Sequence, residues 1–88
     1  MINSILIVKS IVMDYIVMGK LVIVAIKGDC VKVYEIESGI LVGKVDVADR
    51  EIDTNYNYVT AFAYAKEGEV VMGTYNGFIF ILTIIYDH

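Results

Sequence analysis

The segment between residues 46 and 57 carries the side chains best suited to binding a cation. Carboxylate and amide side chains alternate there with other residues, at Asp49, Glu51, Asp53 and Asn55. Alternate residues of an extended segment point to the same side, and oxygen ligands are those that calcium prefers. A helix–loop–helix calcium loop has Gly at its sixth position and Glu at its twelfth, where this chain has Thr54 and Thr60. We expect a solvated connection, with a calcium or other hard-cation site as the alternative.

Other residue types that support catalysis or metal binding are sparse. His88 is the only histidine and ends the sequence, where chains usually fray, whereas a nucleophile needs an oriented base. Cys30 is the only cysteine, and we expect it to be buried beside a turn, since a zinc site needs several ligands. Residues 39–45 have one residue too few between their glycines for a phosphate loop, and Val45 replaces its Ser or Thr. We predict no enzymatic activity and no cofactor; an enzyme would need residues from several chains.

Two tyrosines in predicted connections are the candidate contacts to a ligand or partner. Tyr56 and Tyr75 stand outside the predicted strands, and Asn76 follows the second of them. Exposed aromatic rings at loop tips stack on sugars or anchor a protein partner. We therefore predict a binding surface around Tyr56, Tyr75 and Asn76, with the other aromatic residues mostly in the core.

Short apolar runs rich in Val, Ile and Tyr, separated by glycine-containing turns, predict consecutive β-hairpins. The runs are residues 5–8, 11–17, 21–26, 30–36, 40–47, 59–65, 69–74 and 78–85. The strongest turn signal is Asn76-Gly77, predicted as the two central residues of a type I′ turn. A buried helix in residues 21–26 or 78–85 is the alternative.

The strand pattern occurs twice along the chain. Residues 21–34 align with residues 69–82, each as strand, tight turn and strand, and residues 11–17 align with 59–65. The offset between the two copies lies in the range of about 40–50 residues, with several strands each, that is typical of propeller blades. We therefore predict a single all-β domain over residues 1–88, made of two tandem four-stranded antiparallel units at about 1–47 and 48–88.

The second unit is similar to the core of a WD40 repeat over residues 59–81, in its order of strands and in its Asn76-Gly77 turn. In the first unit Gly28-Asp29 stands at the corresponding turn, and Tyr34-Glu35 stands where that family has Trp-Asp. Neither unit has the Trp-Asp pair or the opening Gly-His of the family, so its buried hydrogen-bond network cannot form. The resemblance implies eight strands, beginning with an outer strand at residues 5–8 that completes the last blade of another chain.

Two blades cannot close a ring, because propellers have typically 4–8. A hydrophobic content of 58% is also more than a small monomer hides, and exposed apolar surface marks interfaces. We therefore predict that the chain completes a ring with copies of itself, as a homotrimer of six blades or a tetramer of eight. A small β-barrel or β-sandwich monomer is the alternative.

The composition argues against several classes of partner. The net charge is −4 and the basic residues are scattered, so we predict no nucleic-acid binding. No apolar run has the length of a spanning helix, and one cysteine forms no intrachain disulfide, so we predict no membrane association and a cytoplasmic location. The expected function is a non-catalytic scaffold for an unknown protein partner. The alternatives are a lectin-like carbohydrate-binding oligomer and an accessory piece that completes a larger propeller.

Overall fold

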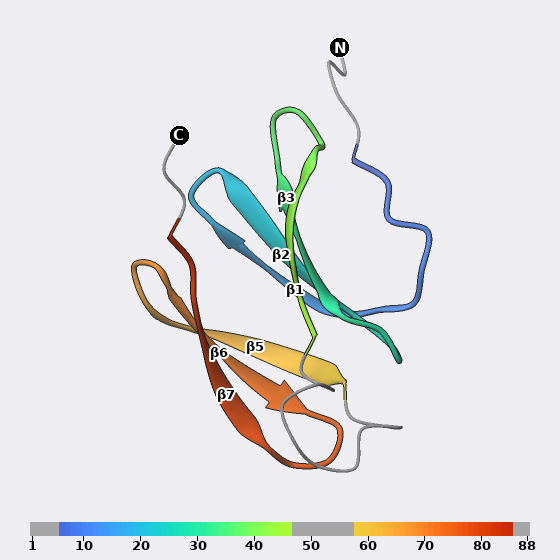
Figure 1. The fold of residues 1–88 in the computed structure, drawn as a ribbon, viewed down its shortest axis with the longest axis vertical. Helices are drawn as coiled ribbons and strands as arrows, with labels where there is room; N and C mark the ends of the chain where they lie inside the picture. Colours follow the sequence, from blue (N-terminus) through green and yellow to red (C-terminus); the bar gives the residue numbers. More distant parts are fainter. Residues whose placement is uncertain (1–5, 47–57, 86–88) are drawn as a thin grey trace.

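Seven strands in two antiparallel sheets form the described part of the chain, residues 6–46 and 58–85 of a computed structural model (Figure 1). Sheet 1 has the strand order β1 (Val12–Met18), β2 (Leu21–Ile26), β3 (Val31–Glu35) and β4 (Leu41–Val45). Sheet 2 has the order β5 (Val59–Lys66), β6 (Glu69–Thr74) and β7 (Ile79–Thr83). The predicted all-β class and its two tandem antiparallel units are confirmed, and the alternative of a buried helix is wrong, since both segments are strands.

The predicted strand at residues 5–8 is wrong where the structure describes it, because residues 6–9 belong to no strand. Leu6 and Val8 pack instead against one face of β2, while Ile7 is 64% exposed. The apolar run that predicted a strand therefore directs two of its side chains onto a sheet. Sheet 2 has three strands among the described residues, as the predicted runs at residues 59–65, 69–74 and 78–85 imply. The fourth strand of this unit was predicted to come from another chain, and this stays a prediction.

The turn between β6 and β7 differs from the predicted type I′ turn by one residue. The Gly77 N–H donates to the Thr74 carbonyl over 3.0 Å, which makes Tyr75 and Asn76 the central residues. Gly77 follows them at φ 87°, a conformation that glycine adopts without strain. The hairpin was predicted correctly, but its loop has one residue more than a two-residue I′ loop, as in hairpins where a glycine follows the turn.

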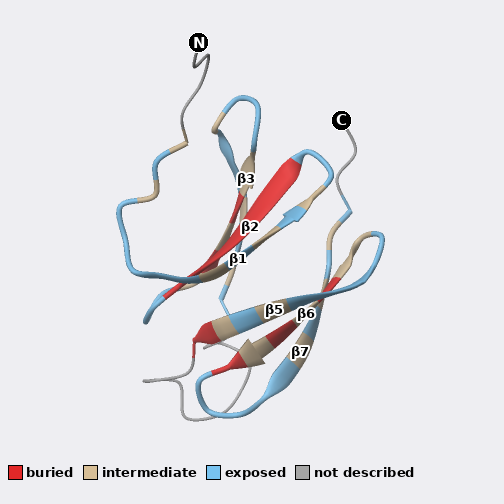
Figure 2. Cartoon of the chain, turned by 180° about the vertical axis from the view of Figure 1, so that it is seen from behind, coloured by how far each residue is buried: buried red, intermediate tan, exposed pale blue. Residues whose placement is uncertain are grey.

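Strand β2 is buried along its whole length, as the continuous red ribbon in Figure 2 shows. On one face Leu21, Ile23 and Ala25 join the core that contains Val70 and Met72 of sheet 2. On the other face lies a second cluster, formed by Val22, Val24 and Ile26 with Leu6, Val8 and Tyr34. An uninterrupted apolar strand is stable only when both of its faces are covered. Here sheet 2 covers one face of β2 and the N-terminal segment covers the other.

Asp14 connects the two sheets through a hydrogen bond. Its Oδ2 accepts the Phe62 N–H of β5 over 2.8 Å, and its Oδ1 accepts the N–H of Tyr15 over 2.8 Å. The register of β1 is irregular between Val12 and Asp14, and β1 and β5 lie side by side. This contact accounts for an acidic residue inside an otherwise apolar strand.

Replacement of Met72 by Ala should lower the free energy of unfolding by about 2–5 kcal/mol, the usual cost of truncating a buried large side chain. Met72 is 2% exposed, whereas Met13 is 38% exposed and makes a matched control. Met13→Ala should change stability by no more than about 0.5 kcal/mol. Urea unfolding at one protein concentration measures both, and equal losses would contradict the assignment of the core.

Replacement of Asp14 by Ala should lower the free energy of unfolding by about 1–3 kcal/mol, because the Phe62 N–H loses its acceptor. Asp14→Asn retains an amide oxygen as acceptor, so its loss should be less than half as large. Urea unfolding of the two variants separates the hydrogen bond from a general effect of charge. If both variants are as stable as the natural chain, the hydrogen bond between Asp14 and Phe62 does not stabilise the contact between the sheets.

Candidate functional site

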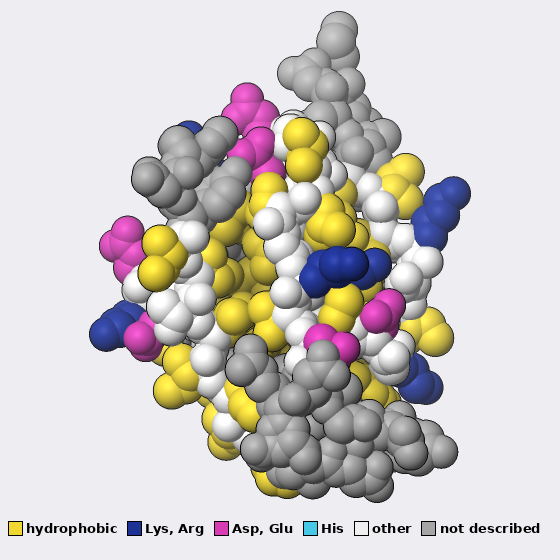
Figure 3. All heavy atoms as spheres, viewed as in Figure 1, with side chains coloured by type: hydrophobic (Ala, Val, Ile, Leu, Met, Phe, Trp, Pro, Cys, Tyr) yellow, Lys and Arg dark blue, Asp and Glu magenta, His cyan; other side chains and the backbone are white. Residues whose placement is uncertain are grey.

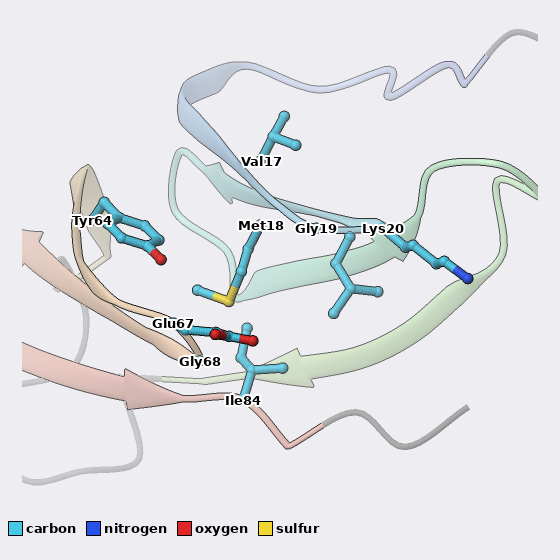
Figure 4. A pocket seen from close by; sticks show the side chains of 9 residues that line it. Val17, Met18, Gly19, Lys20, Tyr64, Glu67, Gly68 and Ile84 are labelled. Carbon is cyan, nitrogen blue, oxygen red and sulfur yellow. The ribbon is translucent and has the colours of Figure 1, made fainter.

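A groove of about 540 Å³ lies at one end of the molecule, between two hairpin turns (Figure 4). The turn at Gly19-Lys20 joins β1 to β2, and the turn at Glu67-Gly68 joins β5 to β6. Each turn joins the first two strands of its unit, so the two turns are counterparts in the repeat. The groove is lined by Val17, Met18, Gly19, Lys20, Leu21, Tyr64, Glu67, Gly68 and Ile84.

Gly68 allows the chain after β7 to approach the floor of this groove. A Cβ atom at Gly68 would lie 3.4 Å from the Ile84 carbonyl oxygen, and its φ of 81° is one that other residues rarely adopt. The Gly68 carbonyl also accepts the Ile84 N–H over 2.8 Å. A glycine at this turn therefore holds Ile84 in the wall of the groove.

The lining of the groove combines apolar side chains with a few polar groups. Its walls are mainly apolar, and the side chain of Lys20 extends away from Glu67 (Figure 4). Tyr64 is 58% exposed and provides a hydroxyl to the lining, and Met18 provides a thioether. This arrangement can hold an apolar side chain next to a carboxylate. This groove was not predicted from the sequence, although the paired glycine turns were a signal for it.

Tyr75 lies at the opposite end of β6 from the groove and is 63% exposed. Its ring stacks on the buried ring of Tyr58, with centroids 5.3 Å apart and planes at 13°. The Tyr75 N–H also donates to the Tyr58 carbonyl over 2.9 Å, which fixes the backbone below the stack. Asn76 is exposed in the same turn. Tyr75 therefore presents a supported ring at the surface, and its predicted contact with a ligand stays a prediction.

Five predicted site residues lie outside the residues that the structure describes: Asp49, Glu51, Asp53, Asn55 and Tyr56. The predicted cation site and the contribution of Tyr56 to a binding surface therefore stay predictions. Within residues 6–46 and 58–85, no three His, Cys, Asp or Glu side chains come together as a metal site requires.

Cys30 lies beside the turn between β2 and β3, as predicted, and it is half-buried where a buried residue was predicted. Burial raises the pKa of the Cys30 thiol, and the neighbouring Asp29 carboxylate raises it further. Asp29 in turn accepts the Cys30 N–H over 2.7 Å, and this backbone hydrogen bond lowers the pKa of Asp29. A thiol with a raised pKa is a weak nucleophile at neutral pH.

The outward face of sheet 2 exposes large apolar side chains. Ile79 and Ile81 of β7 are 73% and 65% exposed. Figure 2 shows β7 largely in the colour of exposed residues, and Figure 3 shows that hydrophobic side chains reach the surface of the molecule in several places. Contiguous exposed apolar surface on a protein usually marks a site of association.

Comparisons with known proteins assign no family to this chain. No family model matches the sequence, and neither a curated protein nor a solved structure matches it. The similarity to WD40 repeats therefore stays a prediction from the sequence. In the part of the chain that is described, no helix has the length and apolar character needed to cross a bilayer.

Alkylation of Cys30 by iodoacetamide should begin at higher pH in the folded chain than in the urea-unfolded chain, because the raised pKa leaves less thiolate at each pH. Asp29→Asn should lower the pH at which alkylation of the folded chain is half-maximal, part of the way towards the value of the unfolded chain, because it removes a nearby negative charge. The signal is specific, since the sequence has one cysteine. A folded midpoint equal to or below the unfolded one would contradict the burial of this thiol.

Proposed function

We propose that this chain is a non-catalytic, propeller-like scaffold that assembles with itself and binds a protein partner. The observation that carries the proposal is the exposed apolar face of sheet 2, with Ile79 and Ile81 on its edge strand β7. A folded chain that hides β2 on both faces, yet leaves these isoleucines open, has surface to cover by association. We also propose a cytoplasmic location, since a chain with one cysteine forms no intrachain disulfide.

The packing of the sheets supports a propeller-like arrangement. The first strands of the two units, β1 and β5, lie side by side, and each sheet continues from its first strand in sequence order. Two sheets do not close a ring, and propellers have typically 4–8. We therefore propose a homotrimer with six sheets, and a tetramer with eight as the alternative. Among the described residues, no strand pairs with the outer edge of β7, at the position that β4 occupies beside β3 in sheet 1. A segment of another chain can pair with this edge.

The outward ring of Tyr75 favours a second candidate function, carbohydrate binding by a lectin-like oligomer. One face of this ring is supported by Tyr58, and 63% of the residue is exposed. An aromatic ring held in this way can stack on the apolar face of a sugar. A glycan array on which the natural chain and a Tyr75→Ala variant give the same empty result would disprove this candidate. A role as the accessory piece of a larger propeller stays a further alternative.

Light scattering on a sizing column tests the self-assembly on which the main proposal depends. We expect three times the mass of one chain at micromolar concentrations and above. Four times that mass would support the tetramer and keep the scaffold proposal. A single-chain mass at every concentration would contradict self-assembly and favour the small β-sandwich monomer or the accessory piece.

A further inference from the structure

The two sheets pack through faces that are not counterparts in the repeat. From sheet 1, β2 contributes Leu21, Ile23 and Ala25 to the shared core. The residues at the corresponding positions of β6 are Glu69, Val71 and Gly73. The core contains instead the residues between them, Val70 and Met72. We call the face of sheet 1 with Ile23, and the face of sheet 2 with Val71, the front faces; the opposite faces are the back faces. The front of sheet 1 therefore packs on the back of sheet 2.

The third strands of the two units show the same relation in their burial. Val31 and Val33 of β3 are 1% and 6% exposed in the shared core. Their counterparts in β7 are Ile79 and Ile81, which are 73% and 65% exposed on the front of sheet 2. The positions of β3 that pack against the other sheet thus have apolar counterparts in β7, and these counterparts are uncovered. The front of sheet 2 has the side chains of an interface but no partner within the described chain.

We infer that the front of sheet 2 binds the back of sheet 1 of a second copy of this chain, repeating between chains the contact between the two sheets. The inference rests on the proposed self-assembly and names the surfaces that produce it. Such a head-to-tail contact uses two different patches, and it closes a ring when the rotation between copies allows. The exposed isoleucines of β7 are then covered by the back of sheet 1 and by the segment with Leu6 and Val8 that lies on it.

The back of sheet 1 presents apolar side chains that suit this contact. Tyr15 and Val17 pair with Val24 and Val22 of β2, so they lie on the back face, where they are 63% and 53% exposed. Ile7 adds a third exposed apolar side chain, since Leu6 and Val8 of the same segment cover β2. Within the chain, β1 and β5 are the closest strands of the two sheets. The corresponding neighbours between chains are the back of one β1 and the front of another β5.

The size of the side chains is complementary across this contact. Ala61 and Ala63 of β5 pair with Gly73 and Val71 of β6, so they lie on the front face, and both are exposed. Small side chains at these positions leave room for the Tyr15 ring of the second copy. Large and small side chains that alternate across two sheets allow them to interdigitate.

Two charge substitutions and their mixture test the inference by light scattering. Ile81→Lys alters the front of sheet 2, and Tyr15→Lys alters the back of sheet 1; each position is more than half exposed, so the single chain can keep its fold. Each variant alone should lose assembly and run at the mass of one chain. An equimolar mixture should form dimers and nothing larger. The intact front of the Tyr15→Lys variant binds the intact back of the Ile81→Lys variant, and the two altered faces of the pair bind no further chain. Ile40→Lys, at a 61% exposed position in the turn after β3, is the control and should assemble like the natural chain.

Far-ultraviolet circular dichroism of each variant confirms that the sheets are retained. If the natural chain assembles but the Tyr15→Lys variant assembles equally well, the back of sheet 1 is not the partner surface and the inference is overturned. If a mixture of two monomeric variants stays monomeric, the head-to-tail contact is likewise overturned, while self-assembly by other surfaces stands. A natural chain that is monomeric at all concentrations overturns the inference and the proposed self-assembly together.

Discussion

Strand β2 consists of six apolar residues in succession, all of them buried, and the rest of the structure depends on covering both of its faces. A half-exposed strand would place alternate side chains in water, at a cost of about 25 cal/mol for each Å² of apolar surface. Sheet 2 provides one cover through Val70 and Met72, and the N-terminal segment provides the other through Leu6 and Val8. The chain after β4 must therefore return against β1 and β2, which places β5 beside them.

The same packing explains why one face of sheet 2 is uncovered, whereas both faces of β2 in sheet 1 are covered. Strand β6 buries only alternate residues, since its front has no cover within the described chain. Asp14 has no carboxylate counterpart in β5, where Ala61, Phe62 and their neighbours are uncharged. The hydrogen bond from Phe62 is thus confined to the contact inside one chain.

The strands of this fold could be predicted from the sequence, because β-branched runs alternate with glycine turns; residues 21–26 and 69–74 match their strands in full. A short apolar run alone could not distinguish a strand from a covering segment, so Leu6 and Val8 were assigned wrongly. The sequence also does not reveal which face of β6 enters the core, since Val70 and Val71 are the same residue type. The groove depends on the approach of two turns from different units, and the placement of the tyrosine ring at position 75 depends on Tyr58; both require the tertiary structure.

Disulfide trapping between copies is the most direct test of whether the two sheets' contact is repeated between chains. In a Cys30→Ala background, one chain carries Ala63→Cys on the front of sheet 2 and another carries Val17→Cys on the back of sheet 1. The account predicts that mild oxidation of the mixture yields mainly the mixed dimer, because front meets back, and that each chain alone yields little. Rapid formation of an Ala63→Cys homodimer, at the rate of the mixed dimer or faster, would show that front meets front and would contradict head-to-tail assembly.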